Sequence, residues 1–115
     1  MNKRALGFEK EKLAAQFLEE KGYQVLEKNF YSHFGELDLI CKKEEYLVFV
    51  EVKYRKELAY GYPLEAVSYR KQQCLLKTAR YYLYKNKIEE ETPCRFDMVS
   101  ILGEKINIIE NCLEF

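Results

Sequence analysis

The sequence predicts an α/β fold in which a mixed sheet carries a helix on each face, in the order α-β-β-β-α-β-β. Two stretches place apolar residues at helical spacing, and five short runs rich in Val, Ile, Leu and aromatic residues are typical of strands. No internal repeat or low-complexity tract divides the chain. We therefore expect one domain over residues 1–115, a length that allows a hydrophobic core but not a second domain.

The first helix is expected over residues 7–21, with Gly22 placed to end it. A first strand follows over residues 23–30, where Val, Leu and aromatic residues are frequent. The stripe that should turn the helix toward the core consists of Leu13, Ala14, Phe17 and Leu18.

Residues 35–40 and 47–53 predict the two strands of a hairpin. Its centre falls at Glu44 and Glu45, an unfavourable tight turn because neither Gly nor Asn is available for a positive φ. Any loop that is symmetric about this centre keeps the same cross-strand facing. A slip of one residue would send one strand's side chains to the other face of the sheet.

This register predicts that two acidic residues converge, because Asp38 falls opposite Glu51 and Glu36 falls opposite Lys53. Directly opposed residues have Cβ atoms roughly 4.5–5.5 Å apart and share a face. Two carboxylates that close repel each other, and their apolar neighbours add a desolvation cost. A divalent cation resolves both problems, so we expect Mg²⁺ or Mn²⁺ to be held by Asp38 and Glu51. The alternative, a cross-strand ion pair at a sheet edge, favours a polar surrounding instead.

Lys53 lies two residues after Glu51 and therefore on the same face of its strand. An ammonium at that position can orient an attacking water or stabilise charge on a phosphate. Glu11 lies at the edge of the inward stripe of the first helix, whereas Glu9 can face outward. A salt bridge from Glu11 to Lys53 or Arg55 is the competing interpretation.

Ser68 is a suitable N-cap for the second helix. Gly61 and Pro63 punctuate the connection that precedes it. Two last strands are expected at Arg95–Leu102 and Lys105–Asn111, joined at Gly103 and Glu104. The inward stripe of the second helix consists of Leu75, Leu76, Ala79, Tyr82 and Leu83.

Four segments together resemble the YraN-like bacterial family, and the resemblance extends over almost the whole chain. The resemblance implies membership of the PD-(D/E)XK superfamily, a restriction-endonuclease-like mixed sheet, and a layout similar to that of archaeal-type Holliday-junction resolvases. The segments are Gly35–Ile40, Leu47–Arg55, Gly61–Val67 and Arg95–Asp97.

The resemblance also implies roles for individual residues. Asp38 matches the metal-binding aspartate, Glu51 the second ligand and Lys53 the catalytic lysine of the superfamily. Glu11 matches a glutamate of the N-terminal helix that helps to build the site in related resolvases. The family pattern has Gly before that glutamate, whereas this chain has Lys10, so Glu9 remains a competitor for the same role.

Composition indicates a globular chain, with 48% hydrophobic and 33% charged residues. No stretch approaches the roughly 18 apolar residues of a membrane span, and the first residues lack the apolar core of a signal peptide. We therefore expect no membrane partner and a cytoplasmic location.

The formal net charge is zero, but the distribution of charge is uneven. Residues 52–87 carry nine Lys or Arg residues against two glutamates. A basic segment that begins at the proposed catalytic lysine is expected where a phosphate backbone approaches an acidic metal site. A solvated helix face is the alternative for any single residue. The expected DNA contacts are Arg55, Arg70, Lys71, Lys77 and Arg80.

The sequence therefore predicts a Mg²⁺-dependent endonuclease that hydrolyses phosphodiester bonds in DNA, branched or recombination-intermediate DNA included. The alternative is a non-catalytic nucleic-acid-binding or partner-binding module that keeps the fold. We expect a two-fold homodimer in the resolvase-like case. Asp97 interrupts an apolar strand and is a further candidate ligand, although pairing with Arg95 is the preferred interpretation.

Overall fold

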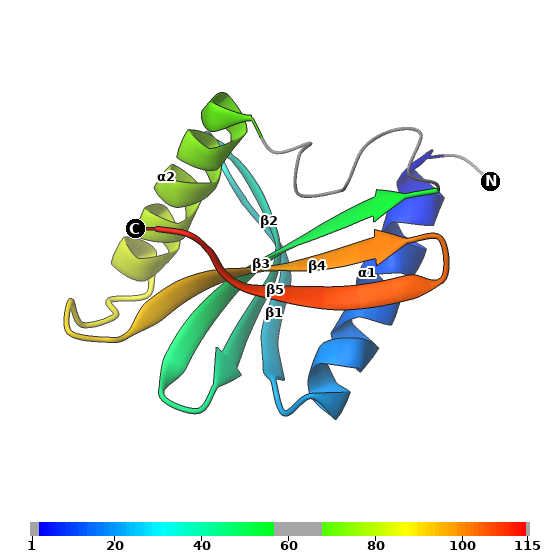
Figure 1. Cartoon of the computed structure of the whole chain (residues 1–115). Coiled ribbons are helices and arrows are strands. Elements are labelled where there is room, and N and C mark those ends of the chain that lie inside the picture. The colour runs from blue at the N-terminus through cyan, green and yellow to red at the C-terminus, as the bar shows by residue number, and fades with distance from the viewer. Residues whose placement is uncertain (1–2, 57–67, 115) are drawn as a thin grey trace.

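The computed structural model describes residues 3–56 and 68–114 (Figure 1). Within them the chain forms two helices and five strands in the predicted order. The connection that holds Gly61 and Pro63 lies outside the described residues. The elements are α1 (Lys3–Glu20), β1 (Gln24–Ser32), β2 (Gly35–Lys43), β3 (Tyr46–Arg55), α2 (Tyr69–Lys85), β4 (Cys94–Leu102) and β5 (Lys105–Leu113).

The strands form one mixed sheet in the order β1-β2-β3-β4-β5. Neighbouring strands are antiparallel except β3 and β4, which are parallel. Two separate hydrophobic clusters cover the sheet, one with residues of α1 and the other with residues of α2. The predicted α/β class with a helix on each face is confirmed, and the layout is consistent with a restriction-endonuclease-like fold. In the described residues, neither helix is long and apolar enough to cross a membrane.

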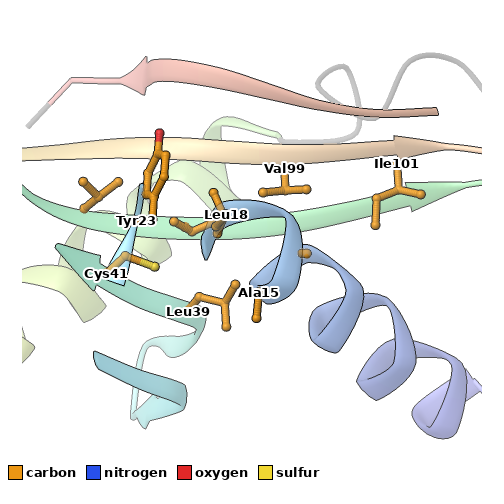
Figure 2. Packing of buried hydrophobic residues seen from close by; sticks show 10 residues of the cluster. Ala15, Leu18, Tyr23, Leu39, Cys41, Val99 and Ile101 are labelled. Atoms are coloured by element: carbon orange, nitrogen blue, oxygen red, sulfur yellow. The ribbon is translucent and has the colours of Figure 1, made fainter. Parts of the chain in front are cut away.

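The cluster beneath α1 is built around small side chains. Ala14 and Ala15 are buried, which lets the helix approach the sheet closely, and Leu18 and Tyr23 extend the contact toward the start of β1. Figure 2 shows Leu39, Cys41, Val99 and Ile101 of the sheet gathered around this helix. Helix α1 begins earlier than predicted, at Lys3. Leu6, which is half-buried, continues the inward stripe toward the N-terminus.

The cluster beneath α2 confirms the predicted stripe of that helix. The Ser68 hydroxyl accepts a hydrogen bond from the Lys71 N–H (3.1 Å), so the helix begins at the predicted cap. Tyr82 packs edge-on against Phe49 of β3, with ring centroids 5.9 Å apart. Strand β5 continues to Leu113, two residues beyond the prediction, because Cys112 and Leu113 pack against this cluster. The stripe residues that are buried are Leu75, Leu76, Ala79 and Tyr82.

The turn between β2 and β3 is tight, with only Glu44 and Glu45 between paired residues of the two strands. Glu44 adopts a φ of 54°, so a glutamate takes the left-handed conformation that Gly or Asn usually occupies. The turn forms despite this local cost, since buried pairs such as Cys41 with Val48 fix the register on both sides.

Helix α1 ends in a Schellman turn at Gly22. The Gly22 N–H donates to the Glu19 carbonyl (3.1 Å), and the Tyr23 N–H donates to the Leu18 carbonyl (3.0 Å). Gly22 has a φ of 92°, which is strained for any residue with a Cβ atom. This turn sends the chain from α1 directly into β1.

We predict that Gly22→Ala destabilises the protein by about 1–2 kcal/mol, because the Cβ atom of alanine is sterically strained in the left-handed conformation that glycine adopts freely. Gly7→Ala is the matched control in the interior of the same helix, where an added Cβ meets nothing within 4 Å. That variant should gain about 1 kcal/mol from helix propensity. Urea and thermal unfolding measure both changes, and equal midpoints for the two variants would contradict this account of the turn.

Candidate metal centre at the parting of two strands

The candidate site lies where β2 separates from β3. Residues of the two strands pair as far as Leu39 with Val50, which confirms the predicted register up to that point. The ladder ends one pair short of Asp38 and Glu51. Leu39 packs into the cluster beneath α1, but Leu37 packs into the cluster beneath α2. Strand β2 therefore turns over at Asp38, which breaks the usual alternation of a strand.

The Asp38 carboxylate occupies the gap that this separation creates. Its Oδ2 atom accepts a hydrogen bond from the Val52 N–H (2.8 Å), a donor on the edge of β3 that β2 no longer covers. The side chain of Asp38 is buried, with 7% of the residue exposed. The predicted pairing of Glu36 with Lys53 is corrected, because Glu36 pairs with Tyr31 of β1 after the strands part.

Glu51 and Lys53 alternate along β3 with Val50 and Val52, which face α1, so the two charged residues face α2. Glu51 is 5% exposed. The Lys71 ammonium, in the first turn of α2, lies 3.4 Å from Glu51 Oε2. Among the described residues this oxygen has no hydrogen-bond partner. A buried carboxylate oxygen thus has a nearby cation but no donor in good geometry.

Glu11 approaches Asp38 from α1. Its carboxylate lies close to Asn29 and Asp38, and in the described part of the chain its Oε1 atom is buried without a hydrogen-bond partner. The pKa of Glu11 is raised, first by burial and then by the negative charge of Glu36. Glu9 is exposed on the same helix, so the structure brings Glu11 to the site and leaves Glu9 outside it.

Glu36 is a site residue that the sequence analysis did not identify as a ligand. One carboxylate oxygen each from Glu11, Glu36 and Asp38 lie within 4.8 Å of one another. Glu36 comes from β2, two residues before Asp38. The sequence feature that could have identified Glu36 is the Glu-Leu-Asp spacing, because residues two apart lie on the same side of a regular strand. The predicted pairing assigned Glu36 to Lys53 instead.

The concentration of carboxylates strongly perturbs Asp38. Burial, a hydrogen bond with Glu51 and the negative charges of Glu51 and Glu11 raise the pKa of Asp38 to about 10, against the opposing effect of the Val52 N–H. Without a cation, Asp38 therefore holds a proton at neutral pH. A hard divalent cation that prefers oxygen ligands would replace this proton.

Glu11, Asp38 and Glu51 line a hollow of about 380 Å³. A larger hollow of about 780 Å³ lies at the C-terminal end of α2, but the smaller one contains the perturbed carboxylates, and we assign the chemistry to it. Both helices and β3 contribute to its wall. Its charged residues are Lys10, Glu11, Asp38, Glu51, Lys53 and Lys71.

The basic residues predicted to contact DNA take different positions. Lys71 lines the hollow beside Glu51. Arg55 is half-buried at the end of β3 and donates to the Tyr54 carbonyl (3.4 Å). The side chains of Arg70, Lys77 and Arg80 are exposed on α2.

Asp97 is not part of the carboxylate group. It is fully buried and paired with Arg95, whose Nε lies 3.0 Å from Oδ1. The Tyr23 hydroxyl donates to Asp97 Oδ2 (2.6 Å), and the Asn111 N–H donates to Oδ1 (2.9 Å). The preferred interpretation, pairing with Arg95, is confirmed.

Comparison with known proteins assigns the chain to a family. Residues 10–101 match the model of the uncharacterised protein family UPF0102. The chain belongs to this family. A UPF0102 protein of Lachnoclostridium phytofermentans is 46% identical over 99% of this chain and 97% of its own length. Others from Syntrophomonas wolfei and Acetivibrio thermocellus are each 49% identical, over 94% and 90% of this chain and 96% and 80% of their own lengths. The UPF0102 family model spans every member of the carboxylate group described above.

We predict that Asp38→Asn stabilises the cation-free protein by roughly 1–3 kcal/mol at pH 8. The amide oxygen can still accept the Val52 N–H, while the variant avoids the cost of keeping a buried carboxyl protonated above its ordinary pKa. The gain should grow with pH. Because the folded pKa of about 10 is above the ordinary value of 3.8, the stability associated with protonated Asp38 is complete below pH 4 and is lost as the pH rises toward 10.

Asp97→Asn is the matched control, since it removes the charge of a second buried aspartate that also accepts a main-chain N–H. It should destabilise the protein by about 3 kcal/mol, because Arg95 loses its partner. Thermal unfolding in chelator at several pH values measures both variants. Destabilisation by Asp38→Asn at pH 8 would show that the carboxylates do not repel each other in the folded protein.

Proposed function

We propose that this UPF0102 protein is a metal-dependent endonuclease of the PD-(D/E)XK type that hydrolyses phosphodiester bonds in DNA. The observation that carries the proposal is the buried Asp38 carboxyl group, which lies next to Glu11 and lines one hollow together with Glu11 and Glu51. Such a group is costly for folding unless a cation uses it. An acidic cluster alone does not establish catalysis, but here Lys53 lines the same hollow.

The residues present fit a hard divalent cation. Buried oxygens of Glu11 and Glu51 have no hydrogen-bond partner among the described residues, and Asp38 is held between them. Oxygen ligands are those that Mg²⁺ and Mn²⁺ prefer. Glu11, Asp38 and Glu51 would hold the ion, with Glu36 within reach. When bound, the ion supplies a Lewis acid that activates water and neutralises charge on the phosphate.

The remaining steps depend on the chain's own cations. The Lys53 ammonium, on the same strand face as Glu51, orients the attacking water and donates to the phosphate. Lys71 stands on the opposite wall, where it neutralises part of the charge of Glu51. Val52 holds Asp38 in place through its N–H. Both ammonium groups line the hollow that contains the carboxylates, which supports a role for them in binding phosphate oxygens.

The test is cleavage of single-stranded, duplex, flap and four-way DNA with Mg²⁺ or Mn²⁺. We predict that Asp38→Asn abolishes cleavage and also the rise in melting temperature that the cation produces in wild type. Lys53→Ala should keep the cation-induced rise but lose cleavage by about 100-fold or more. Lys56→Ala, an exposed lysine beyond the end of β3, is the control and should cleave like wild type.

Two results would overturn the proposal. Cleavage by Lys53→Ala at the wild-type rate would exclude the role given to Lys53. Absence of cleavage by wild type on every DNA, despite a cation-dependent melting shift, would favour the alternative in which the site is retained in a binding module.

Action on four-way DNA requires two sites that face two strands. We therefore predict that the protein forms a two-fold homodimer when bound to a junction. Light scattering of the free protein and of its complex with four-way DNA measures this. A monomer in both samples at micromolar concentration would remove the junction-resolving version and leave a simple nuclease.

A further inference from the structure

The exposed side of α2 has an unusual composition. The helix, Tyr69–Lys85, contains five Lys or Arg residues and no Asp or Glu. Its buried side packs into the cluster beneath α2, and Lys71 lies beside Glu51. The other four cations lie on the outer side and are Arg70, Lys77, Arg80 and Lys85. A solvated helix face normally mixes both signs of charge. An exposed face with cations alone indicates an anionic partner.

Aromatic rings are interleaved with these cations. Tyr84 is 82% exposed, and Tyr81, three residues earlier, is 38% exposed. Residues three or four apart are neighbours on a helix surface, so Arg80 adjoins Tyr84. Burial in the core explains aromatic residues such as Phe49 and Tyr82, but it does not explain a ring that is four-fifths exposed.

The β1–β2 hairpin extends the same surface. The Ser32 and Thr78 hydroxyls are hydrogen-bonded (2.9 Å), which fixes the hairpin against α2. The Lys77 ammonium lies 5.6 Å from the ring centroid of Phe34, which is 44% exposed at the hairpin tip. The Lys85 ammonium lies 5.6 Å from the ring of Phe30 on the same hairpin. The aromatic-basic surface therefore consists of Phe34, Lys77, Arg80, Tyr81, Tyr84 and Lys85.

We propose that the aromatic-basic surface binds a single-stranded nucleic acid, with unpaired bases stacked on the exposed rings and phosphates on the intervening cations. Every base has an aromatic face but duplex DNA does not expose it, so rings between cations favour an unpaired strand. A purely basic face would serve duplex DNA equally well. The chemistry of this face therefore selects the single strand over the duplex.

The position of α2 connects this surface with the candidate metal centre. Lys71, in the first turn, reaches Glu51, and Arg70 beside it is exposed. Figure 1 shows α2 as one continuous helix, so a strand that follows its outer side approaches the hollow at its N-terminal end. This part rests on the proposed function, because it names the unpaired strand of branched DNA as the substrate. The binding step itself does not require cleavage.

The experiment measures fluorescence anisotropy of a labelled 20-nucleotide oligo(dT) and of a duplex of equal length, in chelator so that no cleavage occurs. Wild type should bind the single strand more tightly than the duplex. Tyr84→Ala should weaken single-strand binding about fivefold, the lower end of the energy of one stacked base, whereas Tyr84→Phe should bind like wild type. Phe8→Ala, which removes an exposed ring from α1, is the control and should change nothing.

Salt dependence tests the cations separately. Arg80→Gln should reduce the slope of log affinity against log salt by about 0.7 for the single strand. Comparing the affinity for oligo(U) with that for oligo(dT) shows whether the surface prefers RNA or DNA. Equal affinity for single strand and duplex, together with an unchanged affinity of Tyr84→Ala, would overturn the inference and indicate a purely basic face that binds phosphates without base stacking.

The experiments distinguish failure of the single-strand-binding proposal from failure of the proposed endonuclease. Asp38→Asn should bind the single strand as wild type does, because it lies outside the aromatic-basic surface. Single-strand binding without cleavage by wild type would retain this inference and refute the endonuclease. Cleavage by wild type, together with no effect of Tyr84→Ala on binding, would retain the endonuclease and refute this inference.

Discussion

The repulsion between buried carboxylates at Asp38 is the constraint to which the rest of the site is adapted. Asp38 shares one hollow with Glu11 and Glu51, and the main-chain N–H of Val52 donates to it from the separated strand edge. The fold supplies the burial through two hydrophobic clusters that hold the strands apart at this point. A polar gap in a sheet is otherwise unfavourable, because it exposes unpaired main-chain groups.

The contrast between the two buried aspartates shows that burial alone does not decide the electrostatics. Asp97 is more completely buried than Asp38, yet Arg95, Tyr23 and the Asn111 N–H satisfy it fully. The charged neighbours of Asp38 are carboxyl groups, whereas the charged neighbour of Asp97 is the guanidinium of Arg95. The contacts of Asp97 link β4 to Tyr23 and to β5. The group around Asp38 is instead the one that we propose to bind a cation, which would stabilise it.

Much of this organisation follows from local pattern. Gly22 and Ser68 mark the end of one helix and the start of the other because each satisfies a specific backbone need, a positive φ or an N-terminal hydrogen bond. The hairpin register was predictable because a symmetric loop preserves cross-strand facing, which held even though Glu44 had to adopt an unfavourable conformation. The approach of Asp38 to Glu51 followed from that register.

What the sequence determined by itself was therefore the order of elements, the two helix ends and the proximity of Asp38 to Glu51, since these depend on local periodicity and on one symmetric loop. The tertiary structure decided that β2 turns over at Asp38, that Glu36 joins Glu11, and that Lys71 reaches Glu51. These contacts depend on the point at which β2 and β3 separate, where their side chains pack into the clusters beneath α1 and α2. Such a separation arises from packing between residues distant in the chain, and no local pattern records it.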